Sequence, residues 1–383
     1  MGAKQYAYIN NEMLKWARCE TPLQPEDVAI RIRDISEDNI KMWESGEELP
    51  SISIAKKLAN LYDVPFASFY MTDVPDKTNK DYLDKRTFAN PEEYETMSYE
   101  LWKEIRYFKS CRENILMTIE DDYIGKNLPR INDNSDESIK IIREYFELDT
   151  PLKNKTAFGN SVFNYYRRII ESKGILVFQI SGISTKEIRG LSLNYELFPI
   201  IAVNKNDSDR AKVFTMFHEL AHLIRRTSAL CLVDFSERND REEKECDKIA
   251  GNILVPRSKL NELVKGIIDN DKIDYLSNVF GVSKFVILKR LYDDEKIPLD
   301  FYKNKYDEFY ENFMENKDAI EQSKNDKSFR IPYHVKYIST NGKLFPSIII
   351  NAYYEGKMSF GEICRTLNVK TKQIDKIERM VML

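Results

Sequence analysis

The feature that most constrains this chain is an apolar segment, residues 213–224, that also carries two histidines and a glutamate. Its apolar side chains fall on nearly every side of the helix that the segment predicts, so we expect that helix to be buried. His218 and His222 are four residues apart and lie on one face of it, with Glu219 beside them. Burying these polar groups without partners costs free energy, and a shared metal ion removes that cost. The alternative is a cluster of polar residues satisfied within the core.

The spacing His-Glu-x-x-His on a helix is typical of zinc peptidases. Two imidazoles bind one ion, and zinc lowers the pKa of a coordinated water to about 7. A carboxylate beside that water can take its proton, which is the chemistry of amide hydrolysis. The pattern therefore predicts Zn2+ as the cofactor, His218 and His222 as metal ligands, and Glu219 as the catalytic base.

A third protein ligand is expected, because catalytic zinc sites usually have three such ligands and one open position. Residues 241–256 predict a helix with an apolar stripe facing inward and acidic residues beside it. Glu242 and Glu243 both qualify by periodicity. Asp247 lies four residues after Glu243, where a second carboxylate can accept the free ring N–H of a ligating histidine. We therefore predict Glu243 as the third ligand and Asp247 as the carboxylate that supports a ligating histidine. The alternative is that these acidic residues form only a solvent-exposed face of the helix.

The remaining soft or imidazole donors are weaker candidates for metal binding. Cys246 belongs to the apolar stripe, which favours a small core residue over a thiolate ligand. Cys231 has less to recommend it, and His334 is expected to be a surface or strand residue. The five cysteines are scattered and form no Cys-x-x-Cys pair, so we expect reduced thiols and no disulfide framework.

Composition limits where the protein can be located and which partners it can bind. Hydrophobic residues make up 42% and charged residues 31%, a balance typical of packed globular cores. A net charge of -4 gives no global attraction to nucleic acid, so any DNA contact needs a local basic patch. No apolar run is long enough to span a bilayer, and the first residues lack the apolar core of a signal peptide. We expect a cytoplasmic protein with no membrane partner.

Four parts are predicted along the chain, since 383 residues exceed the usual size of one core. Residues 1–75 read as a set of short helices, and residues 76–155 as a linker, at 76–90, followed by a helical segment. Residues 156–295 combine helices with short strands at 174–180, 191–194 and 198–204. Residues 296–383 are helical, and 355–370 has helix-turn-helix character or simply packs on its neighbour. The fold class expected is α+β and mostly helical.

Four blocks in order resemble the ImmA/IrrE metallopeptidases over roughly residues 160–295. They are Arg189-Gly-Leu-Ser-Leu, Pro199-Ile-Ile-Ala-Val-Asn, Phe214-Thr-Met-Phe-His-Glu-Leu-Ala-His-Leu-Ile and Glu243-Lys-Glu-Cys-Asp-Lys-Ile-Ala-Gly-Asn-Ile-Leu-Val-Pro. The resemblance implies a minimal, thermolysin-like zincin with a small β-sheet, in which His218, His222 and Glu243 are ligands and Glu219 is the general base. Members of this family typically cleave a transcriptional repressor.

The first 75 residues resemble the XRE, or Cro/repressor-like, helix-turn-helix, which implies a five-helix module. The resemblance lies in Trp43-Glu-Ser-Gly-Glu-Glu-Leu-Pro and Lys57-Leu-Ala-Asn-Leu-Tyr-Asp-Val-Pro. The expected recognition helix begins at Ser36 with acidic residues that would face phosphates. Arg31, Arg33 and Lys41 are the residues placed to contact double-stranded DNA. A protein-binding or dimerising role is the alternative for this module.

Two functions follow from these features. The first is a zinc endopeptidase that cleaves a protein regulator, a repressor or an antitoxin-like protein, and is coupled to a helix-turn-helix that contacts DNA. Its substrate is expected to add along the sheet edge at strand 198–203 or its neighbour, with Tyr195 and Arg189 as guesses for the oxyanion stabiliser. The second is a DNA-binding regulator or antitoxin-like protein with a sensory, non-catalytic domain. Glu219 binds no metal and favours the first. The sequence also allows a homodimer.

Overall fold

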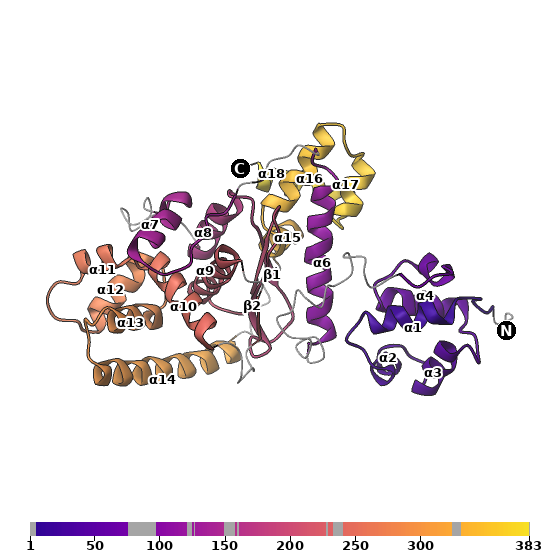
Figure 1. Ribbon diagram of the computed structural model, residues 1–383, viewed down its shortest axis with the longest axis horizontal. Helices are drawn as coiled ribbons and strands as arrows, with labels where there is room; N and C mark the ends of the chain where they lie inside the picture. The colour runs from indigo at the N-terminus through magenta and orange to yellow at the C-terminus, as the bar shows by residue number, and fades with distance from the viewer. Residues whose placement is uncertain are drawn as a thin grey trace. The chain divides into compact units, whose positions relative to one another are not determined.

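The structure of the protein is a computed structural model that describes residues 5–75, 97–120, 125, 127–148, 158, 161–226, 229–232, 240–323 and 331–382. The chain divides into two compact units, residues 1–109 and 110–383, and Figure 1 shows the elements of each. The polar stretch 76–90, which the sequence predicts to be a linker, lies outside the described residues. Each unit is considered by itself.

The first unit is made of short helices around one core. Its elements are α1 (Asn11–Cys19), α2 (Pro25–Arg31), α3 (Glu37–Ser45), α4 (Ile52–Leu61), the 3-10 helix η1 (Phe66–Tyr70) and the start of α6 (Tyr99–Leu116). The core is built from apolar residues of α1 to η1, with Met13, Leu58 and Tyr62 almost fully buried. Ser36 caps α3, the helix expected to begin there, and Gly46 ends it in a left-handed conformation.

Helix α6 extends the first unit beyond residue 75. The indole nitrogen of Trp102 donates to the carbonyl of Glu20, and the hydroxyl of Tyr99 donates to the carbonyl of Leu61. Both bonds tie α6 to helices of the predicted helix-turn-helix module. The compact unit therefore takes in residues that the sequence assigns to the segment 76–155.

The second unit is centred on a four-stranded sheet in the order β1-β3-β2-β4. Its strands are β1 (Leu176–Ile180), β2 (Ile188–Leu193), β3 (Ile200–Asn204) and β4 (Ala229–Leu232). β3 runs parallel to β1 and antiparallel to β2, while β4 is antiparallel to β2. β3 is thus paired on both sides, so the strand expected at 198–203 cannot offer a free edge to a peptide. Within the described residues, the edges of the sheet are β1 and β4.

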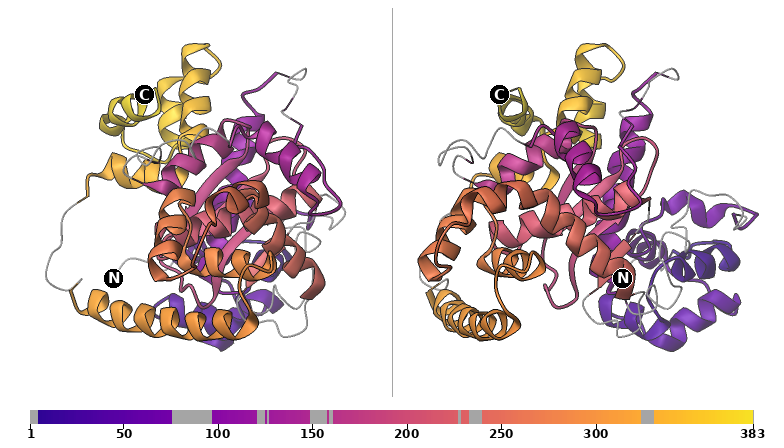
Figure 2. Two further views of the ribbon diagram at one scale, coloured as in Figure 1. Left: turned by 90° about the vertical axis from the view of Figure 1, so that its left-hand side faces the viewer. Right: turned by 60° about the vertical axis from the view of Figure 1, so that its left-hand side comes forward.

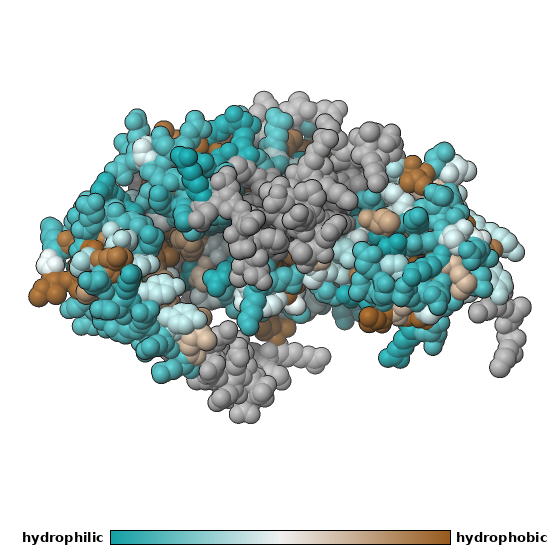
Figure 3. Space-filling view, turned by 60° about the horizontal axis from the view of Figure 1, so that its bottom comes forward, coloured by the Kyte–Doolittle hydropathy of each residue, from teal (hydrophilic) through white to brown (hydrophobic). Residues whose placement is uncertain are grey.

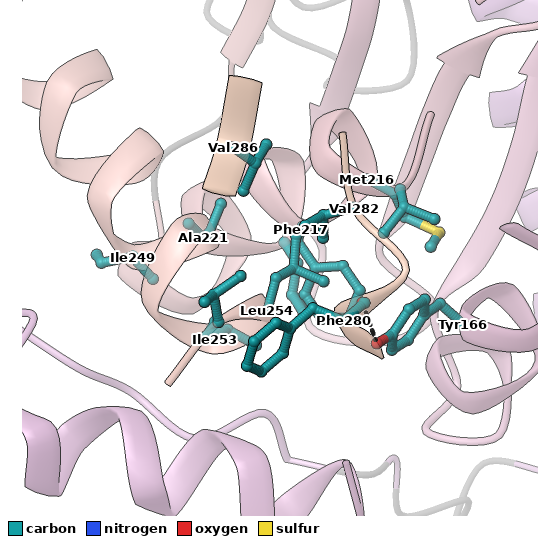
Figure 4. Packing of buried hydrophobic residues seen from close by; sticks show 14 of the residues in the cluster. Tyr166, Met216, Phe217, Ala221, Ile249, Ile253, Leu254, Phe280, Val282 and Val286 are labelled. Atoms are coloured by element: carbon teal, nitrogen blue, oxygen red, sulfur yellow. Dashed lines mark hydrogen bonds between the residues drawn. The ribbon is translucent and has the colours of Figure 1, made fainter. Parts of the chain in front are cut away.

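Helices surround this sheet. They are α7 (Asp136–Tyr145), α8 (Val162–Glu171), α9 (Asp209–Arg225), α10 (Asp240–Leu254), α11 (Arg257–Leu263), α12 (Asn270–Phe280), α13 (Lys284–Asp293) and α14 (Leu299–Ser323). α9 lies against β2 and β3, and α10 packs along α9. Figure 4 shows Phe217 and Ala221 of α9 in the same buried cluster as Ile249 and Ile253 of α10. His218, Glu219 and His222 therefore lie on a deeply buried helix of this unit.

Four C-terminal helices complete the second unit: α15 (Tyr333–Asn341), α16 (Leu344–Tyr354), α17 (Phe360–Thr366) and α18 (Thr371–Val381). α15 contacts β1, beside which it appears in Figure 1. His334, expected in a strand or on the surface, is half-buried on α15. The described residues from 299 onward are mostly helical, as expected for 296–383.

Buried Arg167 joins α15 to the sheet. Its guanidinium donates to the carbonyl of Val177 on the edge strand β1 and, at 2.7 Å, to the carbonyl of Ser339 in α15. Gln179 of β1 also donates to the Ser339 carbonyl, at 2.6 Å. Glu171 lies 3.6 Å from Arg167 and accepts from the backbone of Lys343. The β1 edge is thereby covered by α15, and β4 is the other edge strand of the described sheet.

The surface of the described residues is largely polar. On the face that Figure 3 shows, apolar side chains form separate spots among hydrophilic ones. Figure 2 shows α14 as a long helix at the margin of the second unit, and its exposed aromatic residues include Tyr310 and Phe313. No described helix is both long enough and apolar enough to cross a membrane.

Candidate metal centre

The two histidines and the glutamate of the central spacing come from α9. Ser208 caps this helix by accepting from the backbone of Ala211, and Arg226 ends it in a left-handed conformation. Glu219 and His222 are 0% and 1% exposed, and His218 is 9% exposed. Apolar neighbours on α9 bury the helix on its other sides, as the segment predicts.

Helix α10 brings the third residue. Cys246, Ile249, Ala250 and Ile253 form its buried stripe, as expected from their spacing. This stripe packs on α9, so the first turns of α10 lie beside the histidines. Glu243 approaches both of them with a side chain that is 31% exposed. Glu242 instead lies 3.5 Å from Arg225. Of the two candidate carboxylates, Glu243 is therefore the one beside the histidines.

The closest approaches between the three candidate side chains are of similar length. Nε2 of His218 is 3.1 Å from Nε2 of His222 and 3.1 Å from Oε2 of Glu243, while Nε2 of His222 is 3.5 Å from Oε1 of Glu243. For nitrogen and oxygen ligands at about 2.1 Å, the edge of a tetrahedron around zinc is about 3.4 Å long. The donor set and its spacing therefore fit a tetrahedral zinc ion with one open position.

The second ring nitrogens of both histidines also have neighbours. Nδ1 of His218 lies 2.8 Å from Oδ1 of Asp247, so its N–H can donate to that carboxylate when Nε2 binds a cation. Nδ1 of His222 lies 3.5 Å from Sγ of Cys246. Asp247 thus stands where the spacing predicts, while the contact of Cys246 with a ligand histidine was missed. The only signal for it was its place one turn from Glu243.

The electrostatics favour Glu243 over Cys246 as a ligand. Burial works to raise the pKa of Glu243, but the hydrogen bonds and charges of His218 and His222 lower it overall. Burial raises the pKa of the Cys246 thiol to about 12. Cys246 also forms a second potential ligand group with His222 and Glu242. Because a thiol must lose its proton to bind metal, the group with Glu243 is the better site.

Gly190 on β2 makes room for Glu219. A Cβ at this position would stand 2.5 Å from Cγ2 of Thr215 and 2.9 Å from Oε1 of Glu219. Both contacts are shorter than atoms can approach without displacement, so α9 lies against a strand that has no side chain there. The carboxylate of Glu219 is held between the sheet and its own helix. Gly190 belongs to one of the blocks that resemble ImmA/IrrE proteins, but no sequence pattern predicts this role for it.

The two guesses for an oxyanion stabiliser gain no support. Tyr195 lies beyond the end of β2, with the guanidinium of Arg112 3.9 Å from its ring centre. Arg189 lies near the carboxyl group of Asp207. Burial raises the pKa of this carboxyl, and the positive charge of Arg189 only partly offsets the rise.

The cations expected to contact DNA lie in the first unit, and two of them are paired there. Arg31 lies 2.9 Å from Glu100 and 4.5 Å from the ring centre of Tyr99. Lys41 pairs with Glu37 one turn earlier on α3. Arg33 is exposed, and no ion pair is recorded for it within the described part of the chain. The structure does not bring these three residues together into an unpaired basic patch.

The comparison with protein families gives one result. Residues 170–292 match the model of peptidase family M78, described as the IrrE N-terminal-like domain. The matched segment runs from the end of α8 to α13 and contains His218, Glu219, His222 and Glu243. It supports a metallopeptidase-like domain in this part of the chain. No curated protein and no solved structure matches the chain.

Proposed function

We propose that residues 170–292 are a zinc-dependent endopeptidase that hydrolyses a peptide bond in a protein regulator, a repressor or an antitoxin-like protein. The observation that carries the proposal is the set of ligand separations, 3.1, 3.1 and 3.5 Å, between two imidazole nitrogens and a carboxylate. The peptidase family match supports the same chemistry. A regulator as substrate is what the resemblance to ImmA/IrrE proteins implies.

The chain's own residues divide the work of peptide hydrolysis. His218, His222 and Glu243 hold the ion, and Asp247 fixes the ring of His218 by accepting its N–H. A zinc ion held there supplies Lewis acidity and makes water acidic enough to lose a proton near neutral pH. Glu219 accepts that proton and returns it to the leaving amine. Full burial of Glu219 keeps bulk water away from the carboxylate that moves the proton.

The rival function is a DNA-binding regulator whose metallopeptidase-like domain is sensory. Glu219 argues against it, because a structural metal site needs no base. Gly190 argues against it too, since a strand position kept free of side-chain atoms next to Glu219 serves a carboxylate that must be placed accurately. Both observations favour catalysis.

DNA contact by the first unit stays a prediction with less support than the peptidase. Residues 1–75 hold eight lysines and arginines against twelve aspartates and glutamates. Arg31 and Lys41 are paired with carboxylates of their own unit. An acidic module with paired cations attracts phosphates weakly, which favours the protein-binding role that the sequence left open.

The proposed function is tested by metal content and hydrolysis on four proteins. Elemental analysis of the wild type should find nearly one zinc per chain, and Glu243→Ala should lose most of it. Glu242→Ala is the matched control and should keep the metal. Glu219→Gln should keep zinc yet lose hydrolysis of a quenched fluorescent peptide library by about a hundredfold or more. A wild type without zinc, or an active Glu219→Gln, would contradict the proposal.

A further inference from the structure

The last two helices of the chain, α17 and α18, are joined like a helix-turn-helix. Four residues, 367–370, separate Thr366 from Thr371. Asn368 in this turn has a φ of 50°, the left-handed conformation that glycine often supplies in such turns. Ser359 and Glu362 form a capping box that fixes the start of α17. The chain therefore turns sharply and at a defined place between the two helices.

These helices have an apolar core of their own. Ile363 and Leu367 are buried on the α17 side, and Ile374 and Ile377 on the α18 side. α16 contacts both helices, and α15 also contacts α18. α18 therefore buries one face against its neighbours and presents the other to solvent.

The exposed face of α18 is basic. Lys372, Lys376 and Arg379 follow one another at spacings of four and three residues and are exposed, as is Lys370 just before the helix. Such spacings place side chains on one face of a helix, here the face opposite Ile374 and Ile377. No ion pair is recorded for these four cations in the part of the chain that the structure describes.

Acidic residues nearby do not cancel this surface. Asp375 is exposed at its flank. Glu378 accepts a hydrogen bond from the hydroxyl of Tyr354 on α16, which turns its carboxylate toward the neighbouring helix. Residues 331–383 hold eight lysines and arginines against four aspartates and glutamates, in a chain with a net charge of -4. The part of the chain that holds the helix-turn-helix geometry thus carries a net positive charge.

We propose that α17 and α18 bind double-stranded DNA, with α18 in the major groove. The recognition helix of such a motif lies in that groove, with its first residues toward base edges and cations toward phosphates. Lys370 and Thr371 stand at the start of α18, and Lys376 and Arg379 lie further along the same exposed side. The inference goes beyond the proposed peptidase and does not depend on it.

The test measures binding of the full chain to a labelled, mixed-sequence DNA duplex by fluorescence anisotropy over a range of salt concentrations. Wild type should bind at low salt and weaken as salt rises. The double variant Lys372→Glu with Lys376→Glu should bind about tenfold or more weakly, and its slope of log K against log salt should be smaller by about two. Both side chains are exposed, so the fold, checked by circular dichroism and zinc content, should not change.

The matched control reverses two cations of the first unit, Arg33→Glu with Lys41→Glu. We expect its affinity to stay within about twofold of the wild type. Loss of binding in this control but not in the α18 variant would overturn the proposal and assign DNA to the first unit. A wild type that binds no duplex at low salt would also overturn it and leave the basic face for an acidic protein. These binding results can be interpreted even if the protein contains no zinc, because DNA binding is measured separately from peptide hydrolysis.

Discussion

At the scale of single residues, the site depends on a few side chains whose surroundings give each a different task. His218 has a carboxylate on its second nitrogen, and His222 has a thiol there. A carboxylate acceptor makes an imidazole a stronger ligand than a thiol does. His218 is therefore expected to be the more tightly held of the two rings.

Gly190 provides a test of how closely Glu219 must be placed. In Gly190→Ala the new methyl group would meet the side chains of Thr215 and Glu219 at 2.5 and 2.9 Å, so these two side chains must shift. Zinc should be retained, because none of its ligands is touched. The kcat for peptide hydrolysis should fall by about a hundredfold, the cost of a misplacement of about 1 Å.

The matched control for this variant is Gly361→Ala, where a new Cβ meets nothing within 4 Å. It should retain zinc and the kcat of the wild type. Gly190→Ala with undiminished hydrolysis would show that Glu219 tolerates the methyl group and that the close approach of β2 does not position it.

At the scale of elements, the helices were predicted best. The helices predicted at 213–224 and 241–256 correspond to α9 and α10, and both follow from apolar spacing, which is a local signal. The same holds for His218, His222 and Glu243, which two amphipathic helices bring together. The family model supports the metallopeptidase-like reading of this part.

Features that depend on partners distant in the chain were not predicted. β3 pairs with both β1 and β2, although β2 lies between them in the sequence, and a run of apolar residues does not show which neighbours a strand takes or which strand is an edge. Arg167 likewise reads as one more cation on an amphipathic helix. Only its contacts with Ser339, 172 residues later, show that it joins α8 to α15.

Arg167→Met should therefore destabilise the second unit. The side chain is 3% exposed, and its loss would leave Glu171 as an uncompensated buried carboxylate. The free energy of unfolding in urea should fall by about 3–5 kcal/mol. Arg168→Met, on the exposed side of the same helix, is the control and should change it by less than about 0.5 kcal/mol.

A second variant separates the buried charge from the hydrogen bonds. Replacing Glu171 by Met together with Arg167 removes both members of the pair, so part of the lost stability should return. If the double variant is as unstable as Arg167→Met, then the bonds to the β1 edge and α15, and not the ion pair, dominate.

At the scale of the whole molecule, the two units can be followed by different signals. The three tryptophans, Trp16, Trp43 and Trp102, all lie in residues 1–109, while all three proposed zinc ligands lie in residues 110–383. Tryptophan fluorescence therefore reports on the first unit, and metal binding at the proposed site is expected to stabilise the second. The positions of these residues can be read from the sequence, but the boundary between the units at residue 109 is known only from the structure.

Removing zinc with a chelator should lower the Tm of the second unit only. Saturation with a ligand at a hundred times its Kd stabilises a protein by about 2.7 kcal/mol, so the loss should be visible by calorimetry. The fluorescence transition should stay within about 1 °C of its position in zinc-loaded protein. A chelator that shifts both transitions equally would show that the ion also stabilises the first unit.

The way α10 is fastened has a mechanical consequence. Buried Arg143 and Arg290 donate to the carbonyls of Ile253 and Val255 and so hold the last turn of this helix, whereas Glu243 lies near its first turn. At 1.5 Å per residue the ligand is about 15 Å from that anchor, and a tilt of about 4° moves it by about 1 Å. Metal–ligand distances in a formed site lie within about 0.2 Å of their usual values. A small tilt of α10 would therefore open the site without any contact with the ligand residues themselves.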